Sequence, residues 1–95
     1  MLVTLDTLRS RRADILQLAR AHGASNVRVF GSVARGEATD RSDVDLLVDM
    51  DAGRSMLDLC ALEEDLERML GRPVEIGTSL YPTIRDRVLR EAVAL

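Results

Sequence analysis

The chain has 95 residues, of which 46% are hydrophobic and 31% are charged, and its formal net charge is −3. A chain of this length buries only roughly 60–65% of the surface that its unfolded form exposes, so we expect one compact domain over residues 1–95. Charges occur too early for a secretory signal peptide, and no apolar run approaches the roughly 20 residues that cross a bilayer, so a cytoplasmic location is expected.

The acidic charge balance does not favour nucleic-acid binding, and all 13 basic residues are arginine. One basic cluster, Arg9, Arg11 and Arg12, lies on a predicted helix. It can form a solvated face, a contact with a protein partner or, least favoured, a contact with nucleic acid. Phe30 and Tyr81 are the only aromatic residues, so no stacking platform for single-stranded nucleic acid is visible.

The first half of the chain predicts a helix over residues 6–22, a strand over residues 26–30 and a short helical turn over residues 33–35. Gly23 ends the helix, and His22 lies near its end, where the helix dipole favours a histidine. The apolar positions of the helix are Leu8, Ile15, Leu18 and Ala19. The strand, NVRVF, alternates Val27 and Val29 with Arg28 and Phe30.

A longer helix is predicted after residue 55. Ser55 stands three residues before Asp58 as an N-cap, and Gly71 ends the helix. The apolar stripe of this helix consists of Leu59, Leu62, Leu66 and Met69. Cys60 falls within the helical pattern and is interpreted as a small buried hydrophobe, because a single cysteine forms no intramolecular disulfide.

The remaining elements are a strand over residues 44–50, a strand over residues 72–78 and a last helix opened by Pro82. The strand RPVEIGT faces Val74 and Ile76 one way and Glu75 the other, and the buried side of the last helix consists of Ile84, Val88, Ala92 and Leu95. This order predicts an α/β domain, in which a small mixed sheet of three or four strands packs with about four helices on one or both faces.

Two aspartates lie at the start of the strand VDLLVDM, residues 44–50. Asp43 and Asp45 leave the same face with Cα atoms roughly 6.5–7 Å apart, opposite the apolar face that Val44, Leu46 and Val48 form. Two such carboxylates repel each other, and Mg²⁺ would remove that repulsion. With a third carboxylate, for which Glu75 is the candidate, two metals roughly 3.5–4 Å apart could be held. The alternatives are that the aspartates are solvated turn residues and that Glu75 faces water on an edge strand.

A glycine and a serine separate the strand over residues 26–30 from the helical turn. Gly31 lets the backbone approach a ligand, and Ser32 is expected to cap the turn so that its hydroxyl and the N–H groups point at an anion. This is not a Walker A loop, because the chain contains no lysine. Arg35 either pairs with a triphosphate or holds the loop through a structural salt bridge, and Ser42 hydrogen-bonds the turn into the next strand.

The segment GSVARGEATDRSDVDLLV resembles the G-S-x10-D-x-D signature of the DNA polymerase β-type nucleotidyltransferase superfamily, and the whole chain is similar to its minimal, MNT-type members. The resemblance implies that Gly31 and Ser32 hold nucleotide phosphates and that Asp43 and Asp45 bind Mg²⁺. The third acidic position of that superfamily is commonly an aspartate on the next strand, where this chain has Glu75.

Minimal proteins of this kind are typically encoded beside a HEPN-domain partner. The resemblance therefore implies an antitoxin that transfers AMP from ATP to a tyrosine of a HEPN toxin. The predicted elements after Asp45 leave no room for an acceptor-binding domain, so the acceptor is expected on another chain. One metal would acidify the acceptor hydroxyl and the other would neutralise the leaving pyrophosphate.

Two other functions stay open, namely an antitoxin that binds nucleotide without turnover and blocks its partner, and a transferase for a small molecule. The last helix has more apolar residues than one packing stripe needs, so Leu89 and Val93 belong either to the core or to a partner-binding patch.

Overall fold

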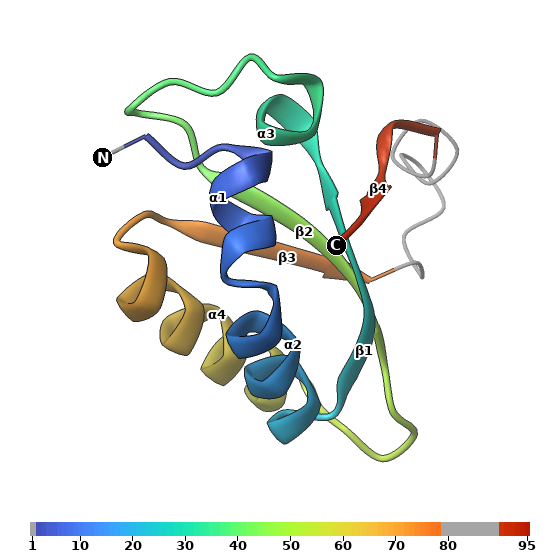
Figure 1. Cartoon of the computed structure of the whole chain (residues 1–95). Coiled ribbons are helices and arrows are strands. Elements are labelled where there is room, and N and C mark those ends of the chain that lie inside the picture. The colour runs from blue at the N-terminus through green and yellow to red at the C-terminus, as the bar shows by residue number, and fades with distance from the viewer. Residues whose placement is uncertain (1, 79–89) are drawn as a thin grey trace.

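The computed structural model describes residues 2–78 and 90–95. In chain order the elements are α1 (Leu5–Ser10), α2 (Arg12–Ala21), β1 (Ala24–Phe30), α3 (Gly31–Arg35), β2 (Val44–Met50), α4 (Met56–Leu70), β3 (Val74–Thr78) and β4 (Val93–Ala94) (Figure 1). None of the helices described is long and apolar enough to cross a membrane.

The four strands form one mixed sheet in the order β3-β2-β1-β4. β2 runs parallel to β3, and β1 runs antiparallel to both β2 and β4. Phe30 pairs with Asp45, which pairs in turn with Glu75. The end of β1 and the starts of β2 and β3 therefore meet at one end of the sheet, and the expected small mixed sheet is confirmed.

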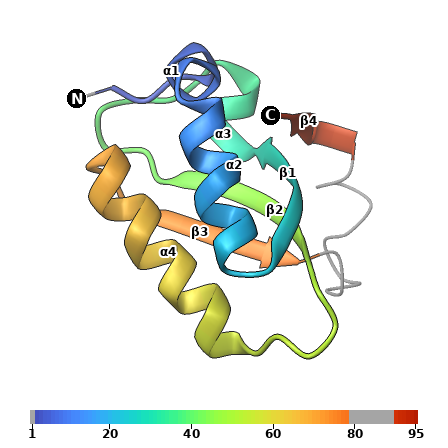
Figure 2. The same ribbon diagram turned by 60° about the horizontal axis from the view of Figure 1, so that its bottom comes forward.

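The helices α2 and α4 lie side by side against one face of this sheet (Figure 1 and Figure 2). The alternation predicted for β2 places its apolar residues under these helices, and Val44, Leu46 and Val48 are buried there. They pack in the core with Leu8, Ile15, Val29, Leu62 and Leu66. Since burying one such side chain contributes about 1.5–3 kcal/mol, this layer is the main source of stability.

The predicted helix over residues 6–22 is interrupted at Arg11, so the expectation of one helix is wrong. The backbone of Arg11 leaves helical geometry with φ −110° and ψ 17°. Its side-chain Nη1 donates to the Met69 carbonyl oxygen at 2.7 Å, near the C-terminal end of α4. The last carbonyls of a helix lack partners within the helix, so this long-range contact offsets the interruption. It joins residues too far apart in sequence for periodicity to reveal it.

The expected caps of α4 are confirmed. Ser55 and Asp58 form a reciprocal capping box, and Gly71 ends the helix in the left-handed conformation, at φ 72°. The buried stripe ends on Leu70, whereas Met69 is partly buried beside it. Cys60 is exposed, so its interpretation as a buried hydrophobe is wrong. It follows Leu59 by one residue, about 100° around the helix and outside the stripe.

The C-terminal end differs from the expected helix. Residues 82–89, which include Leu89, lie outside the described residues, but Val93 and Ala94 form the strand β4. Val93 pairs with Val29 of β1, and the Leu95 N–H donates to the Val27 carbonyl oxygen at 3.1 Å. A helix through residue 95 is therefore wrong, because the free edge of β1 offers these residues backbone partners that local periodicity does not register. Val93 is not on a helical partner-binding face.

Candidate active site

Gly31 begins α3 directly after β1, with φ 71°. This left-handed conformation strains any residue that has a Cβ. A Cβ built at Gly31 would also overlap the carboxylate oxygen Oδ2 of Asp45. Glycine is therefore favoured at this position for two reasons, its backbone angle and the close approach of Asp45. The Gly-Ser step lies directly against the Asp45 carboxylate.

Ser32 lies within the first turn of α3, because the helix already starts at Gly31 and Phe30 occupies the N-cap position without a side-chain hydrogen bond. The expectation that Ser32 caps this turn is therefore wrong. Among the residues that the structure describes, the Ser32 hydroxyl has no hydrogen-bond partner and stays available for a ligand.

Asp45 is the half-buried member of a group of three carboxylates. Burial, together with the nearby charges of Glu75 and Asp43, raises the pKa of Asp45 from 3.8 to about 6, and a hydrogen bond with Glu75 acts in the same direction. Asp43 and Glu75 are both exposed. The parallel register sets Asp45 beside Glu75, so all three acidic residues expected at the site are near one another.

The carboxylates fit a hard cation in chemistry and charge. Within residues 2–78 and 90–95, no group of three or more acidic, histidine or cysteine side chains is placed to hold a metal ion. Mg²⁺ does not require such a group, since it commonly uses one or two carboxylates and completes its shell with water and substrate phosphates. Burial is the main cause of the raised pKa of Asp45, and the repulsion from Glu75 and Asp43 that adds to it is the part that a cation would relieve.

Arg35 is close enough to lower the pKa of Asp45, opposing the carboxylates. Its Nε lies 3.1 Å from Glu37 Oε2 and its Nη1 lies 3.2 Å from Glu91 Oε2. Of the two interpretations of Arg35, the structural salt bridge is present, and contact with a triphosphate stays a prediction.

The turn before β2 is hydrogen-bonded as expected, since the Thr39 N–H donates to Ser42 Oγ at 2.8 Å. Sequence reasoning missed Arg72, whose Nε and Nη2 both donate to the Ser42 carbonyl oxygen, at 3.2 and 3.1 Å. The signal available in sequence was the lone arginine between Gly71 and Pro73, a turn with no helical or strand periodicity.

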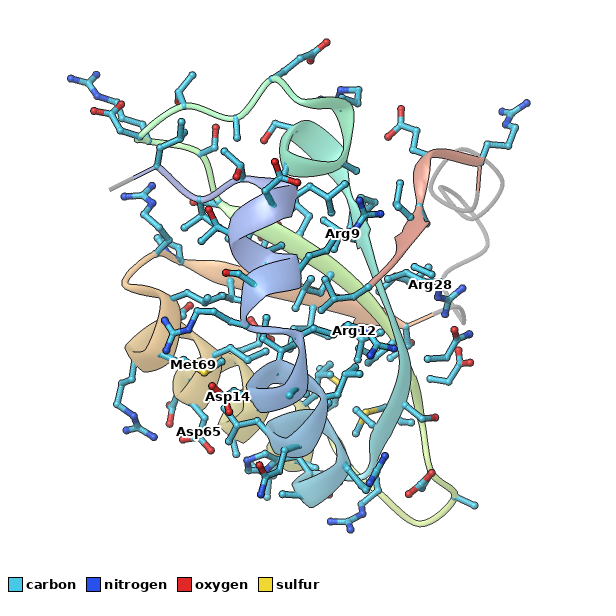
Figure 3. The ribbon with its side chains drawn as sticks, in the orientation of Figure 1. Arg9, Arg12, Asp14, Arg28, Asp65 and Met69 are labelled. Atoms are coloured by element: carbon cyan, nitrogen blue, oxygen red, sulfur yellow. The ribbon has the colours of Figure 1, made fainter. Side chains whose placement is uncertain are left out.

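The other charged residues singled out in the sequence make contacts within the chain. Arg12 Nε reaches from α2 to the Leu95 carbonyl oxygen at 2.8 Å, and Arg28 of β1 pairs with Asp49 at 3.0 Å (Figure 3). His22 ends α2 as expected, and its Nε2 lies 2.7 Å from Asp65 Oδ2 on α4. These contacts join α2 to the C-terminal end of the chain, β1 to β2, and α2 to α4.

A mixed sheet with a Gly-Ser turn after one strand, and an Asp-x-Asp pair at the start of its antiparallel neighbour, defines the nucleotidyltransferase class. The chain belongs to the nucleotidyltransferase domain family, which matches residues 12–94. This confirms the resemblance drawn from the signature motif.

Two relatives and one solved structure agree with that assignment. The protein adenylyltransferase MntA of Thermococcus cleftensis is 41% identical over 97% of this chain and 96% of its own length. A protein assigned as an adenylyltransferase in Methanocaldococcus jannaschii is 42% identical over 86% of this chain and 90% of its own. A structure assigned as a minimal nucleotidyltransferase superposes with a TM-score of 0.85 at 52% identity, covering 98% of this chain and 97% of the other.

The crystal structure of a toxin-antitoxin with AMP-PNP shares the fold, with a TM-score of 0.73. It is 19% identical, and the match covers 86% of this chain and 69% of the other.

Proposed function

We propose that this protein is a Mg²⁺-dependent protein adenylyltransferase that transfers AMP from ATP to a tyrosine hydroxyl of a HEPN-type toxin, and that it acts in the cytoplasm as the antitoxin. The observation that carries the proposal is the half-buried Asp45 carboxylate, which lies against Gly31 and whose pKa is raised first by burial and then by the charges of Glu75 and Asp43. The names of the similar proteins support AMP as the transferred group.

The residues have separate roles in this proposal. Gly31 and Ser32 bind the phosphates, for which the Ser32 hydroxyl is suited because it has no hydrogen-bond partner among the described residues, and Gly31 places this turn against Asp45. Asp43, Asp45 and Glu75 would hold the metal. Bound Mg²⁺ would neutralise charge on the triphosphate and lower the pKa of the acceptor hydroxyl.

The protonation state of Asp45 matters to this chemistry. With a pKa of about 6, Asp45 is mostly ionised at neutral pH and mostly protonated in mild acid. A ligand carboxylate must be ionised, so metal affinity should fall as the pH drops below about 6.

The function is tested by incubating the protein with a HEPN protein encoded beside it, ATP and Mg²⁺, and measuring the intact mass of both chains. The expected result is addition of AMP to the partner. This addition should be lost in the Glu75→Gln variant, which alters the third candidate metal ligand. An ATP analogue with a non-cleavable α,β bridge is the control, because it cannot release AMP. A stable complex with no mass change would instead indicate inhibition by occlusion.

A further inference from the structure

The backbone on both sides of Asp43 is held by the connection between α4 and β3. On the N-terminal side, Arg72 Nε and Nη2 donate to the Ser42 carbonyl oxygen at 3.2 and 3.1 Å. On the C-terminal side, the Val44 N–H donates to the Pro73 carbonyl oxygen at 2.9 Å. In Figure 1 the starts of β2 and β3 lie at the same end of the sheet, which brings this connection beside Asp43.

Arg72 directs two of its N–H groups at one backbone oxygen. The guanidinium fork suits a carboxylate or phosphate, whose two oxygens accept one N–H each. Here both N–H groups converge on one backbone oxygen, so they fix the direction of a single peptide group. Ser42 closes an exposed loop, and Asp43 is itself exposed before β2 begins. Without Arg72, the peptide that sets the direction of the Asp43 side chain would lose this anchor.

We propose that Arg72 is a positioning residue for Asp43, which fixes the Ser42–Asp43 peptide so that the Asp43 carboxylate points to the same place as that of Asp45. This inference rests on the proposed function, because it takes Asp43 as a metal ligand. Partners that orient metal ligands typically change metal affinity by roughly 10–100-fold when they are removed.

The direction in which cation affinity changes when Arg72 is removed distinguishes an effect of its charge from an effect of positioning. Arg72 carries a positive charge, so removing it should strengthen binding of a divalent cation if charge alone mattered. Loss of positioning should weaken binding instead. The two explanations for any effect of Arg72 therefore differ in sign.

The experiment is a calorimetric titration of the nucleotide-free protein with Mn²⁺, which takes oxygen ligands as Mg²⁺ does. Arg72→Met should bind Mn²⁺ at least several-fold more weakly than the wild type, and Arg72→Lys, which keeps the charge and one donor, should lie between them. Arg68→Met is the matched control, because Arg68 is on the same end of α4, 74% exposed, and pairs only with Asp65 among the described residues. It removes the same charge and should leave the affinity unchanged.

A folded Arg72→Met with wild-type or tighter affinity would overturn the proposal. If that variant fails to fold, wild-type affinity in Arg72→Lys would overturn it equally. Asp43→Asn separates the two levels of the argument: unchanged Mn²⁺ binding there removes Asp43 from the metal site and contradicts the proposed function. Weakened binding in Asp43→Asn with normal binding in both Arg72 variants contradicts the positioning role alone. The carbonyl carbon-13 shift of Ser42, measured by NMR, should move in Arg72→Met and stay in place in Arg68→Met.

Discussion

Gly31 shows how one residue position can couple backbone geometry to site chemistry. Its φ of 71° is shared by Gly36, at φ 73°, yet the surroundings of the two glycines differ. A Cβ at Gly36 would meet nothing within 4 Å, whereas one at Gly31 would overlap the Asp45 carboxylate. The two positions therefore separate the effect of a left-handed backbone from the effect of crowding the site.

We predict that Gly31→Ala is more destabilising than Gly36→Ala and also removes activity. Each substitution should cost about 1–2 kcal/mol for the left-handed backbone, and only Gly31→Ala should add the displacement of Asp45. Urea denaturation measures the difference, and AMP transfer measures the loss of function. Equal destabilisation with retained activity in both variants would show that Asp45 moves aside freely.

A second residue-scale prediction concerns Asp45 and pH. Its pKa is higher in the folded protein, about 6, than the ordinary value of 3.8, so the folded state binds this proton more tightly than the unfolded state. The contribution of Asp45 to stability should therefore fall as the pH rises from about 4 to above 6. After allowance for solvent screening, the loss should be on the order of 1–2 kcal/mol.

The check is the free energy of unfolding of the metal-free wild type and of Asp45→Asn across this pH range. The variant cannot ionise at this position, so its stability should exceed that of the wild type at pH above 6 and approach it in acid. Asp58 and Asp65, whose pKa values are lowered, act in the opposite direction in both proteins and cancel in the comparison. A constant difference across the range would mean that Asp45 titrates normally.

At the scale of elements, the sequence predicted correctly those helices, strands and caps that interactions between near neighbours in the chain determine. The alternation of β2, the Ser55 cap and the Gly71 stop were readable because side-chain period and capping chemistry act within a few residues. The interruption at Arg11 and the strand β4 depend on Met69 and on the edge of β1, far away in sequence. The group of three carboxylates could be predicted only in part from local sequence. Asp43 and Asp45 are two residues apart, whereas the position of Glu75 beside Asp45 depends on the register of β3 with β2.

A prediction about β4 concerns the order of stability of two variants at Val93, which is opposite for a strand and for a helix. Val93→Ala should destabilise the protein by up to about 1 kcal/mol, because alanine is poor in strands, and Val93→Thr should have a smaller effect, since it keeps the β-branched shape. In a solvated helix, alanine would be the more stable of the two. Thermal denaturation of both variants distinguishes these cases, and a more stable Val93→Ala would contradict the pairing with Val29.

In the part of the chain that the structure describes, most of the core and the candidate carboxylates lie on opposite faces of the sheet, and Leu47 is the residue of β2 that is buried on the carboxylate side. The apolar side of β2 packs under α2 and α4, while Asp43 and Asp45 leave the other side of the same strand. The core can therefore be disturbed without touching a carboxylate, and the carboxylates can be neutralised without opening the core.

We predict that the double change Asp43→Asn with Asp45→Asn abolishes AMP transfer while the metal-free fold is retained or slightly stabilised, because like-charge repulsion is removed. Leu62→Ala, by contrast, should cost about 2–5 kcal/mol, because Leu62 is fully buried beneath the sheet. Denaturation and activity measured on both proteins test the separation. Full activity in the double variant would exclude these aspartates as metal ligands.

The parallel pairing of β2 with β3 also determines when, during synthesis, the three candidate carboxylates can come together. Parallel neighbours need a crossover, here α4, so Asp45 meets Glu75 only after the chain between them has been made and has closed into a loop. A ribosome exposes the Gly-Ser turn and both aspartates first and the Arg72 segment later. The nascent chain thus carries its signature motif for some time before the whole candidate site exists, and on the proposed function AMP transfer begins only once β3, in the last third of the chain, has paired with β2, in the middle third.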